Sequence, residues 1–421
     1  MAGLVSWGWA VCWCLLFSLL AGGCGEGDTE PVCRDPLGCV EIAPGGPVVV
    51  GVMQVLSGDL RTIGLDQVRG VELAVAACSG EVLGHPVELV FEDSQCTKGG
   101  GSTAALKLAA DPRIAGVVGP TCSGAAVGAA EIFSDSGMVL VSGSSTAPSL
   151  TSVGGLAGLD RHDFFLRTAQ NGAELGRAAA VFAWEELGVA RAAVINDGDE
   201  YTRGLTGEFK RSFQEFGGLI VLDAAVNKGD VDMLPVLRAV FESNAEFLFC
   251  PVFRPEGDYL VLQGAASHDL DKVAVMSSDG LFLDEFLQSA GESAQGMYFV
   301  LPDLPAGEAY EEFVRSYRER YGEPPSTSYH ANTGDAASIL FAAIEAVALQ
   351  GKDGSLLIGR RALRDALFAT RDFPGVTGAV TCDEFGDCAR ARSKVVRLDD
   401  WTAGKEALAG NVVFEYAPLG E

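Results

Sequence analysis

Residues 138–151 read MVLVSGSSTAPSLT, in which four apolar residues are followed by a glycine and a dense group of hydroxyl side chains. The apolar run is typical of a buried strand. Ser, Thr and Gly commonly end strands and cap helices, because their side chains bond free backbone amides. The same small donors could also bind a ligand. Which of these two interpretations holds depends on the other strand ends that share the space.

The segments on either side of this stretch alternate between apolar strands and amphipathic helices. Before it, strands are predicted at 47–54, 85–94 and 114–120, each followed by a helix. Such alternation indicates a parallel sheet with helices on both faces, because every crossover must pass over one face. After residues 164–171 the pattern starts again. The further strands are predicted at 191–197, 219–226, 246–252 and 272–278.

Two sheets of four or five strands exceed one comfortable core, so the sequence predicts an α/β protein with two Rossmann-like lobes. We expect the chain to pass from the first lobe to the second near Arg167 to Asn171. The C-terminal part fits either lobe. We assign 47–167 plus 300–375 to the first lobe, and 168–299 plus 376–421 to the second.

Composition and charge narrow the function. The 421 residues are 48% apolar and 21% charged, which suits a globular protein with ample core. A formal charge of -27 speaks against nucleic acid as a partner, because such a binder needs Lys and Arg to replace counterions on phosphates. The chain has only four scattered histidines and no Cys-x-x-Cys pair, so we expect no metal and no cofactor.

The N-terminus looks like an export signal. Residues 1–25 contain no charged residue and carry Ala-Gly-Gly directly before Cys24. This resembles a bacterial lipoprotein signal, so residues 1–24 are interpreted as a signal peptide and Cys24 as the lipidated N-terminus. An uncleaved membrane anchor is the alternative, because the apolar run is long enough to span a bilayer. Residues 25–46, rich in Gly, Pro and acids, are interpreted as a flexible tether.

Eight cysteines follow Cys24, which agrees with an oxidising compartment. Cys96 and Cys122 follow neighbouring predicted strands, so a disulfide between them is geometrically plausible. Two reduced core cysteines are the alternative, as we expect for Cys78 and Cys250. Two further pairs, Cys33 with Cys39 and Cys382 with Cys388, each bracket five residues and suggest small local disulfide loops.

The strand ends also suggest where a ligand would bind. In open parallel sheets the ligand lies beyond the carboxyl ends of the strands. In the first lobe these ends carry the hydroxyls and amides of Thr121 to Ser123 and Ser142 to Thr146. In the second lobe they carry an aromatic side chain and an acid, Tyr201 and Asp279. Singly these residues could be helix caps or surface side chains, but together they would suit a zwitterion held between the lobes.

The same residues carry a family resemblance. The stretch TCSGAAVGAAEIFSDSGMVLVSGSSTAPSLT at 121–151 is accompanied by EDSQC at 92–96, INDGDEYTRGL at 195–205 and MSSDG at 276–280. Together they resemble the type I periplasmic binding proteins of branched-chain amino-acid (leucine/isoleucine/valine) ABC transporters, over about Val48 to Leu398. The resemblance implies two lobes that close like a hinge on one small solute and are joined by three crossing segments.

The resemblance also implies roles for particular residues. Ser123 and Thr146 would bind a ligand carboxylate, and the loop at Ser144 and Ser145 would receive the ammonium at its backbone. Asp279 would complete the ammonium contact, and Tyr201 would close over the ligand. Phe253 and Tyr329 are expected in the side-chain pocket. The sequence differs from the family pattern at two positions near this pocket. Ile63 stands where an aromatic residue is often found. Arg254 is either a solvated surface charge or a residue that selects a larger or acidic solute.

The sequence therefore predicts an exported, lipid-anchored and monomeric binding protein. It would capture an amino acid or similar small zwitterion and deliver it to an ABC permease. The alternative is a ligand-sensing module of the same fold that acts on a signalling partner. An enzyme is not expected, because the chain lacks the G-x-S-x-G, P-loop, H-E-x-x-H and G-x-G-x-x-G motifs.

Overall fold

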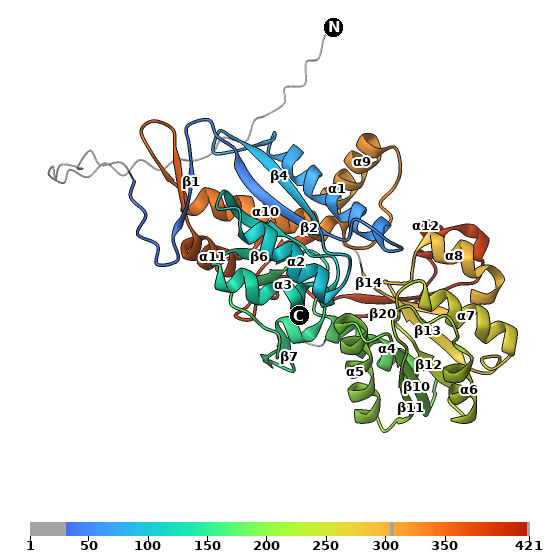
Figure 1. The fold of residues 1–421 in the computed structure, drawn as a ribbon. Helices are drawn as coiled ribbons and strands as arrows, with labels where there is room; N and C mark the ends of the chain where they lie inside the picture. Colours follow the sequence, from blue (N-terminus) through green and yellow to red (C-terminus); the bar gives the residue numbers. More distant parts are fainter. Residues whose placement is uncertain (1–30, 304–306, 419–421) are drawn as a thin grey trace, which may run out of the picture.

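A computed structural model describes residues 31–303 and 307–418, which form two groups of strands and helices (Figure 1). The predicted signal peptide at 1–24 and its Cys24 lie outside the described residues. The groups are named the first lobe and the second lobe below. No helix in the described part is both long and apolar enough to cross a membrane.

The first lobe is built on a six-stranded sheet with the order β3-β4-β2-β5-β6-β9. Every residue of the central strand β2 is buried, as its uninterrupted apolar sequence predicts for a strand covered on both faces. Helices α2 and α3 pack together on one face, and α1 packs with α10 on the other. The bounds are β2 Val48–Gln54, β3 Glu81–Val82, β4 His85–Asp93, β5 Ile114–Val118, β6 Val139–Ser142, β9 Phe165–Arg167, α1 Arg61–Ala77, α2 Lys98–Ala109 and α3 Ser123–Asp135.

The second lobe has a seven-stranded sheet with the order β11-β10-β12-β13-β14-β19-β20. The strands from β10 to β14 are parallel, whereas β19 and β20 add an antiparallel edge. The bounds are β10 Arg191–Asn196, β11 Leu219–Ala225, β12 Phe247–Phe249, β13 Ala274–Ser278, β14 Tyr298–Pro302, β19 Ser393–Arg397, β20 Val412–Tyr416, α4 Gly172–Val181, α5 Glu200–Glu215, α6 Leu234–Glu242, α7 Glu256–Ser267, α8 Asp284–Ala290 and α12 Lys405–Leu408.

The C-terminal part is shared between the lobes. Figure 1 shows the orange helices α10 and α11 beside the blue strands of the first lobe, while β20 lies with the second. The helices are α9 Glu308–Tyr321, α10 His330–Val347 and α11 Arg360–Phe368, and the small strands are β7 Ser152–Val153, β8 Leu156–Ala157, β15 Leu349–Gln350, β16 Leu356–Gly359, β17 Phe373–Gly375 and β18 Gly378–Val380. The chain passes between the lobes after Arg167, after Pro302 and after Cys388, which agrees with a hinge of three segments.

Two boundaries differ from the sequence assignment. Residues 300–302 end β14 and so belong to the second lobe. Residues 376–388 stay with the first lobe, because Val380, Cys382 and Cys388 are buried in its core. Both errors arise where the chain crosses the hinge, since local sequence does not show which sheet a short segment joins.

The predicted tether is also shorter than expected. Residues 39–42 form strand β1, Cys39–Ile42, which pairs antiparallel with β16. Val40 and Ile42 are buried, because their alternation places both apolar side chains on the core face. The prediction of a flexible tether over 25–46 is therefore wrong for this strand.

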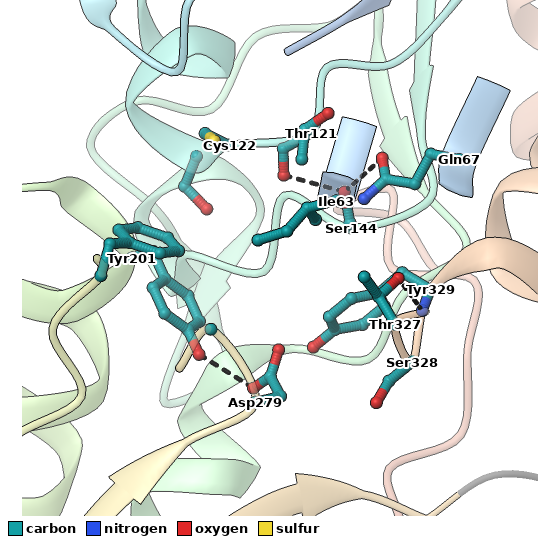
Figure 2. Close-up of a pocket in the computed structure, with 13 residues that line it drawn as sticks. Ile63, Gln67, Thr121, Cys122, Ser144, Tyr201, Asp279, Thr327, Ser328 and Tyr329 are labelled. Atoms are coloured by element: carbon teal, nitrogen blue, oxygen red, sulfur yellow. Dashed lines mark hydrogen bonds between the residues drawn. The ribbon is translucent and has the colours of Figure 1, made fainter. Parts of the chain in front are cut away.

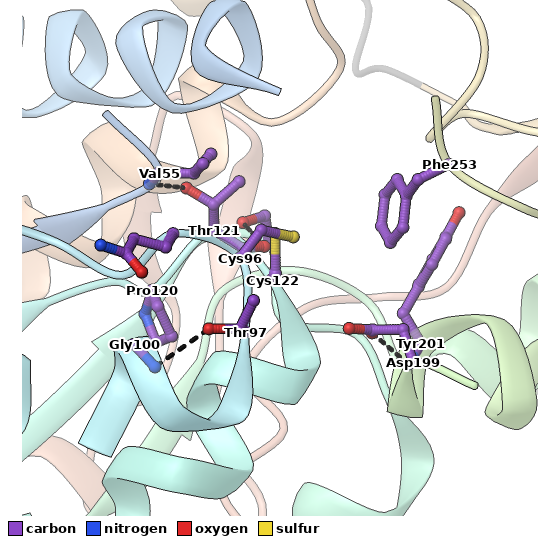
Figure 3. Close-up of a disulfide and its surroundings, with 12 residues drawn as sticks. Val55, Cys96, Thr97, Gly100, Pro120, Thr121, Cys122, Asp199, Tyr201 and Phe253 are labelled. Carbon is purple, nitrogen blue, oxygen red and sulfur yellow. Dashed lines mark hydrogen bonds between the residues drawn. A yellow bond between two sulfur atoms is a disulfide. The ribbon is translucent and has the colours of Figure 1, made fainter. Parts of the chain in front are cut away.

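The structure contains three disulfides among its described residues. Cys96 is joined to Cys122 beside the interface between the lobes, as Figure 3 shows, and Cys33–Cys39 and Cys382–Cys388 close the two local loops. The predicted pairings are confirmed. Cys78 and Cys250 are free thiols, and burial raises the pKa of Cys250 to about 12, which makes it unreactive.

The buried guanidinium of Arg167 joins segments that are distant in sequence. Its Nε lies 2.5 Å from Oδ1 of Asp387. Its Nη1 donates to the carbonyl oxygens of Ser145 at 3.1 Å and Ala147 at 2.8 Å. Asp387 also accepts from the Asn171 side chain at 3.1 Å. The first and third crossing segments and the 144–147 loop therefore share one buried ion pair.

We expect Arg167→Met to lower the free energy of unfolding by about 3–5 kcal/mol, because it leaves the Asp387 carboxylate without its charged partner. Urea denaturation followed by circular dichroism measures the change. Arg315→Met is the control, because Arg315 forms an exposed pair with Glu312 on α9 and should change stability little. Equal small losses in both variants would show that the buried pair does not hold the fold together.

Candidate functional site

A pocket lies between the lobes, at the carboxyl ends of strands from both sheets (Figure 2). It contains about 460 Å³ of space not filled by atoms, part of it open to solvent. Helix α1, the loops after β5 and β6 and the loop before α10 supply the wall from the first lobe. The lining residues are Ile63, Gln67, Thr121, Cys122, Ser123, Ser144, Tyr201, Phe253, Asp279, Gly280, Thr327, Ser328 and Tyr329.

The wall from the first lobe is a buried polar network. The Ser144 hydroxyl lies 2.8 Å from the Thr121 carbonyl oxygen and 3.0 Å from Oε1 of Gln67. Thr121 in turn donates its hydroxyl to Oε1 of Gln54 at 2.7 Å. Such a network fixes the side chains rigidly and leaves little freedom for the wall to adapt.

Ser123 stands at the start of α3, whose first turn has no side-chain cap. Its hydroxyl accepts a hydrogen bond from the Ala147 backbone at 3.0 Å, so it ties this helix to the 144–147 loop. The uncapped amides at a helix N-terminus favour an anionic group. This end of α3 borders the pocket through Cys122 and Ser123.

Two residues of the predicted set do not line the pocket. Ser145 donates its hydroxyl to the Pro120 carbonyl at 2.9 Å, so it supports the loop from within. Thr146 is buried, and its hydroxyl has no hydrogen-bond partner among the described residues. The reason for both placements is Arg167, which binds the carbonyls on either side of Thr146 and turns this part of the loop inward.

The wall from the second lobe is centred on Asp279. The Tyr201 hydroxyl lies 2.8 Å from Oδ1 of Asp279 and 2.7 Å from the Ser278 hydroxyl. Figure 2 shows the Tyr329 hydroxyl pointing toward the same carboxylate. Burial raises the pKa of Asp279 to about 6, although the two tyrosines stabilise its ionised form. A cation in the pocket would therefore be attracted here.

Aromatic side chains form the remaining surface of the second-lobe wall. Phe253 packs against Tyr201 with the ring centroids 5.2 Å apart. The neighbouring Arg254 does not line the pocket, because its Nε pairs with Asp258 at 2.7 Å. Arg254 therefore has no direct contact through which to select a solute.

The lobes touch on both sides of the pocket, so the structure shows a closed arrangement. Lys228 of the second lobe donates to the Cys96 carbonyl at 3.1 Å, and Thr62 of the first lobe donates to Glu285 at 2.8 Å. Lys405, in α12 of the second lobe, donates to the carbonyl of Ser326, in the loop that continues into the pocket wall. These contacts can form only when the lobes meet.

Sequence reasoning missed Gln67, Thr327 and Ser328. Gln67 follows Ile63 by four residues in α1, so both side chains lie on one face of the helix. That spacing could have indicated Gln67. Thr327 and Ser328 come from a loop whose position depends on the buried Asp66, which accepts from the Thr327 backbone at 3.0 Å. No local pattern reports that contact.

The fold and the pocket define a two-lobed solute-binding protein, in which a hinge closes two walls on one ligand. A model of the periplasmic binding protein family matches residues 47–400. The chain therefore belongs to the periplasmic binding protein family, whose members act outside the cytoplasm and bind rather than catalyse. The predicted family and the prediction of a binding protein rather than an enzyme are confirmed by this match.

Particular relatives agree with this assignment. The Leu/Ile/Val-binding protein BraC3 of Rhizobium johnstonii is 28% identical over 85% of this chain and 92% of its own. The Leu/Ile/Val-binding protein of Escherichia coli K12 is 24% identical over 65% of this chain and 73% of its own.

Solved structures confirm the fold. The leucine-binding protein LivK of Thermotoga maritima has a TM-score of 0.75 at 24% identity, covering 88% of this chain and 99% of its own. A solute-binding protein of R. palustris in complex with benzoate has a TM-score of 0.72 at 19% identity, covering 89% of this chain and 98% of its own.

The raised pKa of Asp279 makes the stability of the free protein depend on pH. Its usual pKa is near 3.8, so between about pH 4 and pH 6 the folded state holds more protons than the unfolded state. The stabilising contribution of the protonated carboxyl is therefore present at low pH and is lost as the pH rises through 6.

We expect Asp279→Asn to gain stability relative to the wild type between pH 4 and pH 8, by about 1–3 kcal/mol, because the amide carries no charge to desolvate. Urea denaturation of the ligand-free protein at several pH values measures the difference. Asp135→Asn, at the exposed end of α3, serves as a control for loss of one surface carboxylate. If the difference in the free energy of unfolding between Asp279→Asn and the wild type did not change with pH, the raised pKa of Asp279 would be contradicted.

Proposed function

We propose that this protein captures one amino acid, or a similar small zwitterionic solute, between its lobes and delivers it to an ABC importer. The observation that carries the proposal is the Asp279 carboxylate, which faces the pocket with two tyrosine hydroxyls around it. No Lys or Arg is among the described residues that line the pocket. A buried carboxylate without a cation is costly, so a ligand ammonium would stabilise it.

The ligand carboxylate would lie on the first lobe. The uncapped start of α3 provides backbone amides, and Ser123 provides a hydroxyl. Thr146 could join them if its unpartnered hydroxyl turns toward the ligand when the lobes move. The two charges of the solute would then be bound by different lobes, so that both lobes are needed for tight binding.

The named relatives bind different solutes. BraC3 is a Leu/Ile/Val-binding protein, whereas the R. palustris structure holds benzoate. Benzoate has a carboxylate but no ammonium, so it would leave Asp279 without a cationic partner. The acid wall therefore favours an amino acid over an aromatic acid as the solute of this chain.

We expect α-amino acids to raise the melting temperature of the protein more than benzoate or short organic acids do. A ligand at 100 times its dissociation constant adds about 2.7 kcal/mol to stability. Asp279→Asn should weaken amino-acid binding about tenfold or more, because the ammonium loses a charged partner. It should also reduce ligand-driven compaction in small-angle scattering, since closure depends on contacts from the second lobe.

Tyr259→Phe is a suitable control, because Tyr259 lies on α7 and does not line the pocket. Thermal shift identifies the solute class, and isothermal titration then gives the affinities of wild type and variants. Equal affinity and equal compaction in wild type and Asp279→Asn would overturn the role of Asp279. If benzoate stabilised the protein and amino acids did not, the proposed solute would be an aromatic acid and not an amino acid.

We further propose that the mature protein starts at a lipidated Cys24, which would hold it at the cell envelope near its permease. The support is the run of small residues before Cys24 and the eight later cysteines, six of which form disulfides.

We expect Cys24→Ser to release the protein from the membrane fraction or to leave it unprocessed, because the serine cannot be acylated. Cell fractionation and intact mass of the wild type and the variant measure this. The matched control is Cys14→Ser, which keeps the proposed acceptor. A wild-type N-terminus at Met1 would instead support an uncleaved anchor.

A further inference from the structure

The pocket wall that faces Asp279 carries an unpaired amide group. Gln67 is fully buried on α1 and lines the pocket, and its Nε2 has no hydrogen-bond partner among the described residues. Figure 2 shows Gln67 beside Ser144, across the pocket from Asp279. A buried polar group without a partner is destabilising, so its presence at a binding site indicates a partner on the ligand.

The amide cannot be satisfied by turning over. Ser144 has one hydroxyl hydrogen, which can serve the Thr121 carbonyl at 2.8 Å or Oε1 of Gln67 at 3.0 Å. If the amide were flipped, its nitrogen would donate to Ser144 and its oxygen would take the unpaired place. In both orientations one polar atom of Gln67 remains without a protein partner.

The neighbouring groups do not relieve this. The hydroxyl hydrogen of Thr121 is donated to Gln54, and the same oxygen accepts from the Val55 backbone at 3.1 Å. The Thr327 hydroxyl is donated to Asp66 at 2.6 Å. The hydroxyl hydrogens of Ser144, Thr121 and Thr327 are therefore all donated to other protein groups, and the end of Gln67 is left for the solute.

Resting on the proposed capture of an amino acid, we propose that Gln67 selects solutes whose side chain ends in a neutral hydrogen-bonding group, an amide or a hydroxyl. An aliphatic side chain of the same shape would fill the space but leave the buried amide unpaired. A site built to hydrogen-bond one group rejects the analogue that lacks it far more strongly than an apolar pocket rejects a small change in size. Gln67 therefore discriminates between solutes by the polarity of their side chains.

Acidic side chains are excluded by charge. A second carboxylate would enter a pocket that already contains Asp279, and its described lining residues include no Lys or Arg. Like charges in a desolvated site repel strongly. Amide- and hydroxyl-bearing amino acids thus fit where aliphatic and acidic ones do not.

Isothermal titration with amino acids of matched shape tests the inference. Asparagine and leucine form one pair and threonine and valine form the other, with aspartate as the charged analogue of asparagine. We expect the wild type to bind the polar member of at least one pair about 10- to 100-fold more tightly than its aliphatic partner. Gln67→Met keeps the length of the side chain without the amide, and should remove or reverse that preference.

The matched control replaces a glutamine outside the pocket wall with the same residue, methionine. The control variant is not Gln54→Met, because Gln54 accepts the Thr121 hydroxyl of the pocket wall, but Gln214→Met: Gln214 is exposed on α5 and does not line the pocket, so its replacement should leave the preference unchanged. Tighter binding of leucine and valine by the wild type would overturn the selection by Gln67 while leaving amino-acid capture intact. The same preference in wild type and Gln67→Met would also overturn it. Binding of no α-amino acid at all would overturn the proposed function itself.

Discussion

The ion pair between Arg167 and Asp387 is the constraint on which the hinge and the ligand loop both depend. Arg167 ends β9 at the first crossing, and Asp387 precedes the third. The disulfide between Cys382 and Cys388 closes the loop that presents Asp387. Backbone hydrogen bonds add to the pair, since Arg167 donates to the Gly386 carbonyl and accepts from the Cys388 amide, both at 2.9 Å. Two crossings are thereby held at one point of the first lobe, so the second lobe moves relative to a fixed anchor.

Closure relies on weaker contacts than the hinge does. The polar contacts across the cleft come from Lys228, Thr62 and Lys405, and each of these side chains keeps part of its surface in solvent. Partly exposed pairs of this kind contribute little each, so the lobes can separate without a large loss of free energy. This combination of a rigid anchor and reversible contacts suits a protein that must take up a solute and release it again.

The sequence predicted the architecture well because its signals are local. The apolar run of β2, the alternation with helices and the cysteines after neighbouring strands each follow from short segments. Ser123, Ser144, Tyr201 and Asp279 were found for the same reason, since strand ends position them. Ser145 and Thr146 were expected in the pocket but do not line it, because their orientation is set by Arg167 and a partner 220 residues farther along the chain. Residues 300–302 and 376–388 were assigned to the wrong lobe, because a short segment at the hinge can join the sheet of either lobe.

The pocket joins selectivity and closure through the same unpaired groups. Asp279 needs a cation and Gln67 needs a hydrogen-bonding partner, and each is poorly solvated when the lobes meet. In an open protein water would supply both needs, so the closed arrangement is disfavoured until a solute replaces that water. A solute that pairs with only one of the two groups leaves the other buried without a partner, and this unpaired group then opposes closure of the lobes. The groups proposed to recognise the ligand would therefore also decide whether the lobes close, and a solute of the wrong polarity would bind to one wall without drawing in the other.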